Sequence, residues 1–225
     1  YALLRGHRYS DHAREVGIQS MTLRMGDSSD IVPIIHRHFM GKRAQLTGVE
    51  IGVHKGETSE ALLRTFPQLH LFMVDPWATY ETSHAYRKSG DGCASLTARE
   101  QAANCALATK RTEKFYNRRT IRAMESLQAA RSFAGLADRL DNAFDGRFDF
   151  VFVDGDHTYN SVKADIEAWW PLVNNGGLLC GHDIDHPRDR RGLWGVRRAV
   201  EEHAAATGLT FEVAGSCWWF VKREW

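Results

Sequence analysis

The sequence predicts an α/β protein, a three-layer sandwich in which helices cover both faces of a mostly parallel sheet. Apolar runs at residues 45–51, 69–74 and 148–153 have the near-continuous pattern of strands buried on both faces. Segments with helical spacing of apolar residues follow the first and third runs, as βαβ units require. Polar residues cluster where these runs end, which is where open α/β sheets bind ligands.

Length and composition favour a single domain spanning residues 1–225. The chain is long enough to bury a substantial core, and 43% of its residues are hydrophobic and 25% charged. A net charge of +1 argues against a nucleic-acid partner, and no apolar run approaches the roughly 20 residues that span a bilayer. The cysteines at positions 93, 105, 180 and 217 are too far apart for a Cys-x-x-Cys pair, which predicts reduced thiols and a cytoplasmic location. Because the chain begins with Tyr1, we expect a trimmed N-terminus.

The first elements are an N-terminal helical extension and a strand that turns sharply into a helix. Within residues 1–44, the Ser-Ser-Asp sequence at 28–30 is typical of a helix cap, and the helix should end near residue 41. The strand at 45–51 then leads into Glu50, Gly52 and Gly56, spaced as acid-x-Gly-x-x-x-Gly. Thr58 and Ser59 are expected to cap a helix from residue 60. Such a turn presents backbone N–H groups and a positive helix end to a ligand.

The second strand, at residues 69–74, ends in Asp75. This acid lies about 25 residues beyond Glu50, where a doubly wound nucleotide site places a carboxylate on the ribose hydroxyls. The alternative is an ordinary strand-ending Asp before Pro76. Trp77 next to it is expected either to cover a bound base or simply to pack.

The middle of the chain predicts a lid, a helix and a third strand. Residues 78–96 lack apolar periodicity, and we expect either a lid over the site or a surface loop. Thr97 and Glu100 form a capping-box pattern for a helix to about residue 110. A third strand is expected within residues 115–122, followed by Met124, Glu125 and Ser126.

The strand at residues 148–153 delivers the densest polar cluster, Asp-Gly-Asp-His at 154–157. A helix is predicted over residues 162–173, then a strand at 177–180 that leads into Gly-His-Asp at 181–183. The carboxyl ends of parallel strands meet at one edge, so these two clusters should lie together. A helix at 193–206 and a closing strand pair at 210–213 and 218–221 complete the chain.

These motifs together resemble class I S-adenosylmethionine-dependent methyltransferases from about residue 46 to the C-terminus. The fourth-strand sequence Val-Asp-Gly-Asp-His-x-Tyr at 153–159 is similar to that of a small-molecule subfamily. The resemblance implies a seven-stranded Rossmann-like sheet with a C-terminal antiparallel strand. It also implies S-adenosylmethionine as the cofactor, held by Glu50, Gly52, Val53, His54, Gly56, Ser59, Asp75, Trp77, Glu125, Ser126 and Asp154. Glu125 and Ser126 depart from the commoner Gly-Asp-Ser at the adenine end.

His157 is the candidate catalytic base. A hydroxyl acceptor must lose its proton during methylation, and an imidazole with a pKa near ~6.5 suits that role at neutral pH. Asp156 is expected to orient the imidazole. The alternative is that His157 only caps the following helix. The Asn/Asp-Pro-Pro-Tyr signature of amino methylation is absent after the fourth strand, which favours an oxygen acceptor on a small molecule.

A divalent metal is the open question of the predicted site. Related O-methyltransferases hold Mg²⁺ with acids at the ends of the fourth and fifth strands, which here offer Asp154, His182 and Asp183. An imidazole among them departs from the all-oxygen set that Mg²⁺ prefers. We therefore favour catalysis without metal.

The remaining expectations concern partners. Five arginines between residues 188 and 198 predict either a clamp for an anionic acceptor or a solvated face. The tryptophan pairs at 169–170 and 218–219 predict packing and leave a homodimer contact open. Two other functions stay open: a non-catalytic cofactor-binding module, and a nicotinamide oxidoreductase, which would need the spacing Gly-x-Gly-x-x-Gly.

Overall fold

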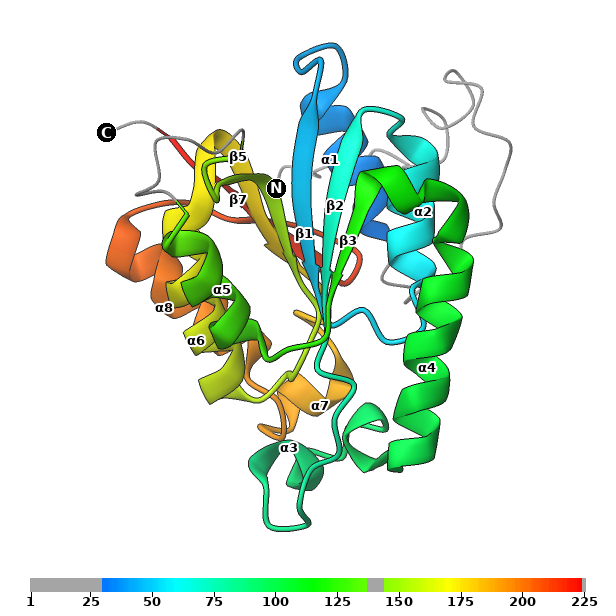
Figure 1. Ribbon diagram of the computed structural model, residues 1–225. Helices are drawn as coiled ribbons and strands as arrows, with labels where there is room; N and C mark the ends of the chain where they lie inside the picture. Colours follow the sequence, from blue (N-terminus) through cyan, green and yellow to red (C-terminus); the bar gives the residue numbers. More distant parts are fainter. Residues whose placement is uncertain (1–29, 137–143, 224–225) are drawn as a thin grey trace.

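The computed structural model describes residues 30–136 and 144–223, and its sheet confirms the predicted fold class (Figure 1). Within these residues, seven strands lie in the order β3-β2-β1-β4-β5-β7-β6. Neighbours from β3 to β5 are parallel, whereas β7 runs antiparallel to both β5 and β6. The strands are β1 Leu46–Ile51, β2 Leu69–Val74, β3 Arg119–Arg122, β4 Phe148–Val153, β5 Val173–Gly181, β6 Glu212–Ala214 and β7 Cys217–Val221.

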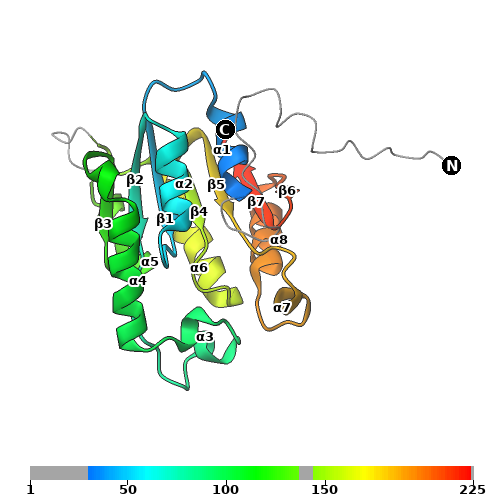
Figure 2. The ribbon, with the colours of Figure 1, turned by 90° about the vertical axis from the view of Figure 1, so that its right-hand side faces the viewer.

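The helices form two layers and a group beyond the strand ends. In Figure 1, α1, α2 and α4 lie on one face of the sheet and α5, α6 and α8 on the other. Both views place α3 and α7 beyond the carboxyl ends of the strands (Figure 2). The helices are α1 Ile31–Phe39, α2 Glu57–Thr65, α3 Ala85–Lys88, α4 Ala98–Arg111, α5 Ser126–Ala134, α6 Tyr159–Trp169, α7 Pro187–Arg190 and α8 Val196–Thr207. None of the helices in the described ranges is long and apolar enough to cross a membrane.

The strands alternate their side chains between two hydrophobic cores. Val151 of β4 packs in the core under α5, α6 and α8, whereas Phe150 and Phe152 pack under α1 and α2. All three are fully buried. Because β4 is covered on both faces, nearly every position must be apolar, which is why its sequence indicated a strand without alternation.

Several predicted boundaries are confirmed and others are wrong. The capping box of Thr97 and Glu100 opens α4, and α1 follows Asp30 as expected. Residues 28 and 29 of the predicted cap, like the rest of residues 1–29, lie outside the described residues. The helix predicted to run to residue 173 ends at Trp169 and is followed by a 3₁₀ turn, Trp170–Leu172. Pro171 cannot donate an N–H to the helix, so β5 begins earlier than predicted, at Val173.

The start of α2 also differs from the prediction. The helix begins at Glu57 with Gly56 as its N-cap residue, so Thr58 and Ser59 lie within the first turn and are not caps. Gly56 has a φ of 76°, in the left-handed region that favours glycine. The chain therefore turns into the helix three residues earlier than the sequence predicted.

Gly48 of β1 gives a test of how tightly β1 and β4 are packed. A Cβ at this position would lie 2.1 Å from the ring of Phe150, which is fully buried. Gly48→Ala should lower the free energy of unfolding by about 1–3 kcal/mol, because the added methyl group overpacks the core. Urea denaturation followed by circular dichroism measures this change.

Gly92→Ala is the matched control for this substitution. Gly92 has a φ of −63°, and no atom of the described residues lies within 4 Å of the position that an added methyl group would take. Its stability should stay within roughly 0.5 kcal/mol of wild type. A Gly48→Ala protein as stable as wild type would contradict the tight packing of β1 against β4.

Candidate functional site

The turn between β1 and α2 is shaped by close backbone contacts. Gly52 has a φ of 87°, and a Cβ there would lie 2.1 Å from the carbonyl oxygen of Asp154. A Cβ at Gly56 would lie 2.9 Å from the Cα of Ala108 in α4. Both glycines are thus required so that the turn can pass close to the loop after β4 and to α4. His54 between them also has a positive φ, of 50°.

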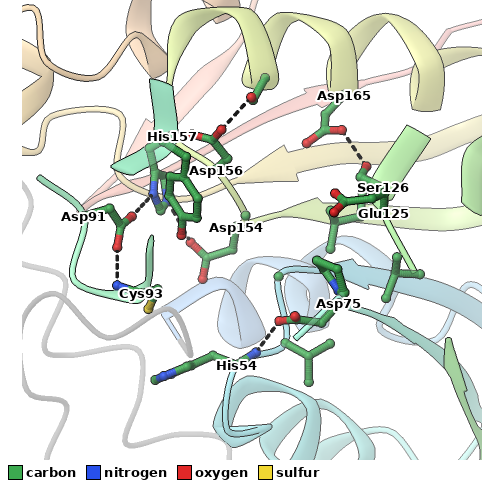
Figure 3. Close-up of a pocket in the computed structure, with 18 of the residues that line it drawn as sticks. His54, Asp75, Asp91, Cys93, Glu125, Ser126, Asp154, Asp156, His157 and Asp165 are labelled. Carbon is green, nitrogen blue, oxygen red and sulfur yellow. Dashed lines mark hydrogen bonds and ion pairs between the residues drawn. The ribbon is translucent and has the colours of Figure 1, made fainter. Parts of the chain in front are cut away.

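Asp75 fastens this turn to the end of β2. One carboxylate oxygen accepts the N–H of His54 at 2.8 Å (Figure 3). The other accepts the N–H of Trp77 at 2.7 Å. Burial raises the pKa of Asp75, and these backbone donors act in the opposite direction. A carboxylate has further lone pairs, so Asp75 can hold the turn and still accept a hydrogen bond from a ligand.

Trp77 also holds the turn between β1 and α2 in place. Its indole N–H donates to the carbonyl oxygen of His54 at 2.8 Å, and the side chain is 9% exposed. The cavity is lined by its neighbours Pro76 and Ala78 and not by Trp77 itself. The packing alternative is therefore the better description of Trp77 than a cover for a bound base.

A buried hydrogen bond between Glu50 and Ser59 connects β1 with α2. The Ser59 hydroxyl donates to the Glu50 carboxylate, and both residues are almost fully buried. Burial raises the pKa of Glu50 well above its usual range, with the Ser59 hydrogen bond opposing the change and Asp154 and Asp75 adding to it. Glu50 also lines the cavity, whereas Ser59 and Gly56 lie behind its wall.

A second cluster lies at the ends of β4 and β5, as the sequence predicted. Asp154 follows β4, and His182 and Asp183 follow β5. The Nδ1 atom of His182 lies 3.3 Å from Asp183 and 4.0 Å from Asp154. Asp183 has a φ of 62°, a strained conformation of the kind that collects at functional sites. All three side chains line the same cavity as Gly52 and Asp75.

His157 lies among three carboxylates. Its Nδ1 atom is 2.9 Å from Asp91, and its Nε2 atom is 3.2 Å from Asp183 and 3.5 Å from Asp154. Burial lowers the pKa of His157, but these carboxylates outweigh burial and raise the pKa to about 10. The ordinary pKa that the sequence suggested is therefore wrong for this environment.

The expected partner of His157 also needs correction. Asp156 accepts the backbone N–H of Thr158 at 2.8 Å and the hydroxyl of Ser161 at 2.7 Å, so its carboxylate holds the start of α6 and does not orient the imidazole. Asp91 orients the imidazole instead. Asp91 comes from the segment 78–96, and Figure 3 shows it reaching His157 from the side opposite Asp156.

The segment 78–96 supplies one wall of the cavity, with Ala78, Tyr80, His84, Tyr86, Asp91 and Cys93. Tyr80 packs on Tyr86 at a centroid distance of 5.2 Å, and Tyr86 is largely buried. The segment therefore lines the cavity, and its role as a lid stays a prediction.

Trp194 is a site residue that the sequence analysis missed. Its ring stacks between those of His157 and His186, at centroid distances of 4.3 and 4.2 Å. Trp194 lies at the end of the loop before α8, and no local sequence pattern connects it with residue 157. Only the return of the chain past the end of β5 brings the two rings together.

The donor set at the strand ends can be compared with the needs of a metal. Oxygen or nitrogen atoms of Asp154, His182 and Asp183 all lie within 4.8 Å of one another. Two carboxylates and an imidazole fit a transition metal better than Mg²⁺, which prefers oxygen. His157 Nε2 already lies beside both carboxylates. These residues could hold a transition metal, but they are not the ligands of an all-oxygen Mg²⁺ site.

Glu125 and Ser126 lie at the other end of the cavity, at the start of α5. Ser126 donates its hydroxyl proton to Asp165 of α6, a second residue that the sequence analysis missed. Burial raises the pKa of Asp165 to about 7, and the Ser126 hydrogen bond opposes the change. The cavity of about 870 Å³ therefore extends from Asp165 past Asp75 to His157.

Of the arginines predicted either to clamp an anionic acceptor or to form a solvated face, two pair with carboxylates and one lies over Trp194. Arg197 pairs with Asp185 at 2.7 Å, and Arg198 pairs with Glu202 at 2.9 Å. Arg188 lies over the Trp194 ring at 5.5 Å. None of the five arginines of the 188–198 segment lines the cavity.

Solved structures that resemble this chain include methyltransferases. The calicheamicin methyltransferase CalS11 matches with a TM-score of 0.61 and 13% identity, over 86% of this chain and 77% of that chain. The O-methyltransferase from Bacillus cereus, solved in complex with SAH, has a TM-score of 0.59 and 15% identity, over 94% and 86% of the two chains. The N-methyltransferase NodS from Bradyrhizobium japonicum has a TM-score of 0.52 and 16% identity, over 87% and 96%. Identities this low show a shared fold.

Sequence comparison identifies the family. The uncharacterized protein y4gI from Sinorhizobium fredii is 35% identical over 57 residues, which are 25% of this chain and only 6% of that protein. A family model described as a methyltransferase domain matches residues 49–184, more than half of the chain. The matched range contains the Gly52 turn, Asp75 and the Asp154–Asp183 cluster. The chain therefore belongs to the methyltransferase domain family.

Proposed function

We propose that this protein is an S-adenosylmethionine-dependent methyltransferase that acts on a hydroxyl group of a small molecule. The observation that carries the proposal is one continuous cavity with a cofactor-type turn at one side and the His157 cluster at another. Its volume of about 870 Å³ lies in the range of small-molecule sites. The O-methyltransferase from Bacillus cereus, whose fold this chain shares, was solved in complex with SAH.

The proposed cofactor position follows the cavity wall. Gly52, Val53 and His54 would lie along the methionine end, where the turn exposes backbone to the cavity. Asp75 would accept a ribose hydroxyl, and Glu125 and Ser126 lie where the base would end. Gly56 and Ser59 would support this wall from behind, through the packing against Ala108 and the bond to Glu50.

The proposed mechanism assigns proton removal to the pair of Asp91 and His157. When bound, S-adenosylmethionine supplies an electrophilic methyl group, and the protein mainly orients the acceptor. Asp91 accepts the Nδ1 proton of His157, and Nε2, on the other side of the ring, lies beside Asp154 and Asp183, which line the cavity. His157 Nε2 is buried and has no well-aligned hydrogen bond within the described residues. In its deprotonated form, which the raised pKa of His157 restricts to alkaline pH, Nε2 is positioned to take the proton of an acceptor hydroxyl.

We propose that this reaction needs no metal. His182 and His157 place two imidazoles beside Asp154 and Asp183, where an all-oxygen site would need further oxygen ligands. The charge of the acceptor stays a prediction, with Arg188 the arginine placed nearest to the Trp194 stack. A non-catalytic binding module would bind the cofactor without turnover, so affinity and turnover measured together distinguish the two functions.

Asp75→Ala tests the cofactor assignment. S-Adenosylhomocysteine should bind wild type in the micromolar range and raise the melting temperature. The variant should bind on the order of 10- to 100-fold more weakly, because charge-assisted hydrogen bonds to the ribose are lost. Calorimetry measures both affinities. Asp145→Ala is the control, because Asp145 also accepts a backbone N–H but does not line this cavity. Unchanged affinity in Asp75→Ala, or a preference for NAD, would defeat the assignment.

His157→Ala tests the base. Its kcat should fall by roughly 10²–10⁴, while affinity for S-adenosylhomocysteine stays near that of wild type. A base must be deprotonated to act, so the wild-type rate should rise with pH. Because the carboxylates raise the pKa of His157, the midpoint should lie above the ordinary ~6.5.

Asp91→Asn separates orientation from simple packing. Replacing the carboxylate removes one of the interactions that raise the pKa of His157, so the midpoint of the pH profile should move down. His70→Ala, at a histidine that bonds Thr120 on β3 away from the cavity, should keep the wild-type profile. Near-normal kcat in His157→Ala with an unchanged pH profile would leave this histidine a structural role only.

Chelation tests the metal proposal. Turnover should survive dialysis against EDTA, because the proposed proton acceptor is an imidazole and not a metal-bound group. Product formation measured by mass, with and without added Mg²⁺ or Mn²⁺, decides the matter. Loss of turnover in EDTA that either ion restores would assign Asp154, His182 and Asp183 as ligands.

A further inference from the structure

Asp165 is a buried carboxylate of the cavity wall that proton removal and methyl transfer do not use. It lies on α6, is 5% exposed and lines the cavity. Its Oδ1 atom accepts the Ser126 hydroxyl proton, and no hydrogen bond to its Oδ2 atom is found within residues 30–136 and 144–223. Figure 3 shows the second oxygen turned away from Ser126. This oxygen is not among the fully buried side-chain atoms of the described residues that lack a partner, so it is open to the cavity and available to a donor of a ligand.

The orientation of Asp165 is fixed by hydrogen bonds between α5 and α6. The indole N–H of Trp169 donates to Ser126 Oγ at 2.9 Å, and Ser126 in turn donates to Asp165. Trp169 is fully buried between Phe133 and Phe148, so the first donor is held by the core. The Ser126 proton is committed to Asp165, and this leaves the carboxylate as the acceptor that faces the cavity.

Two acceptor groups meet at this end of the cavity. Glu125 lines it from the start of α5, and the charges of Glu125 and Asp156 both raise the pKa of Asp165. Ionised carboxylates accept hydrogen bonds and cannot donate them. A purine with an exocyclic amine brings two N–H donors, whereas one with a carbonyl oxygen at that position brings another acceptor. The lining chemistry therefore favours the amine.

We infer that Asp165, together with Glu125, selects an adenine-type base by accepting hydrogen bonds from its exocyclic amine. This specificity role rests on the proposed cofactor and adds to it a residue that discriminates among nucleosides. A site built to hydrogen-bond a donor rejects an analogue without it, because the buried acceptor is then left unpaired.

Calorimetry with two ligands tests this role: S-adenosylhomocysteine and S-inosylhomocysteine, which has a carbonyl oxygen in place of the amine. Burial raises the pKa of Asp165 to about 7, so titrations at about pH 8 keep most of the carboxylate ionised. Wild type should prefer S-adenosylhomocysteine by about 30-fold or more. In Asp165→Asn, which has the same shape but an amide that can donate, the preference should fall about 10-fold.

Asp149→Asn is the matched control. Asp149 is equally buried, at 5% exposed, but lies at the start of β4, bonds the backbone of Thr47 and lines no part of the cavity. Its variant should keep the wild-type preference. Ser126→Ala is a second test variant, because it removes the hydrogen bond that orients Asp165, and its preference should also fall.

The outcomes separate this inference from the proposed function. If wild type binds neither ligand, the proposed cofactor fails, and the role of Asp165 fails with it. If wild type binds S-adenosylhomocysteine and Asp165→Asn keeps the full preference, the inference alone is overturned and Asp165 only ties α6 to α5. If Asp165→Asn does not fold, Ser126→Ala decides: a reduced preference supports the inference and an unchanged preference overturns it.

Discussion

The site depends on the close approach of two chain segments, the one that follows β1 and the one that follows β4. Gly52 passes so near the carbonyl oxygen of Asp154 that no side chain fits between them, since a Cβ at position 52 would lie 2.1 Å from that oxygen. The N–H of Asp154 in turn donates to the carbonyl oxygen of Ile51 at 2.8 Å. This close approach places the turn proposed to bind the cofactor beside the cluster proposed to bind the acceptor. Any side chain at position 52 would force the two apart and divide the cavity.

Several carboxyl groups line the cavity, and different hydrogen-bond partners stabilise them. Glu50 is held by the Ser59 hydroxyl, and Asp75 by backbone N–H groups. Asp91 is held instead by His157, whose imidazole also lies beside Asp154 and Asp183. An imidazolium at this place offsets negative charge that would otherwise repel itself at short range. The same arrangement aligns the imidazole, so charge balance and orientation come from one set of contacts.

The chemistry of a methyltransferase places modest demands on such a framework. The cofactor carries the reactive group, and the protein must align an acceptor and remove a proton. A shared fold does not determine the acceptor, and the resembling structures include both an O-methyltransferase and an N-methyltransferase. Under the proposed mechanism, substrate choice depends on side chains around the His157 cluster. The segment 78–96 and the loop before α8 supply most of those that are not on strand ends.

The sequence by itself determined the sheet and the positions where polar residues leave it. Hydrophobic runs such as 148–153 are local patterns, and burial on both faces leaves them few alternatives. Asp75 and Asp154 follow strands directly, and Asp183 follows β5 after His182, so their meeting at one edge follows from parallel strand order. Helix ends were predicted less well, because Gly56 caps α2 through a left-handed conformation that depends on packing against Ala108.

Only the tertiary structure decided which side chains act together. Asp91 and His157 are 66 residues apart, and Ser126 and Asp165 are 39 apart, with no periodicity that links them. The sequence favoured Asp156 as the partner of His157 because it is adjacent, yet an Asp two residues before Thr158 has a nearer donor in that backbone N–H. The pKa of His157 likewise depends on carboxylates from three separate segments. Local pattern fixes where the chain turns, whereas partners and protonation depend on distances that only the packed fold sets.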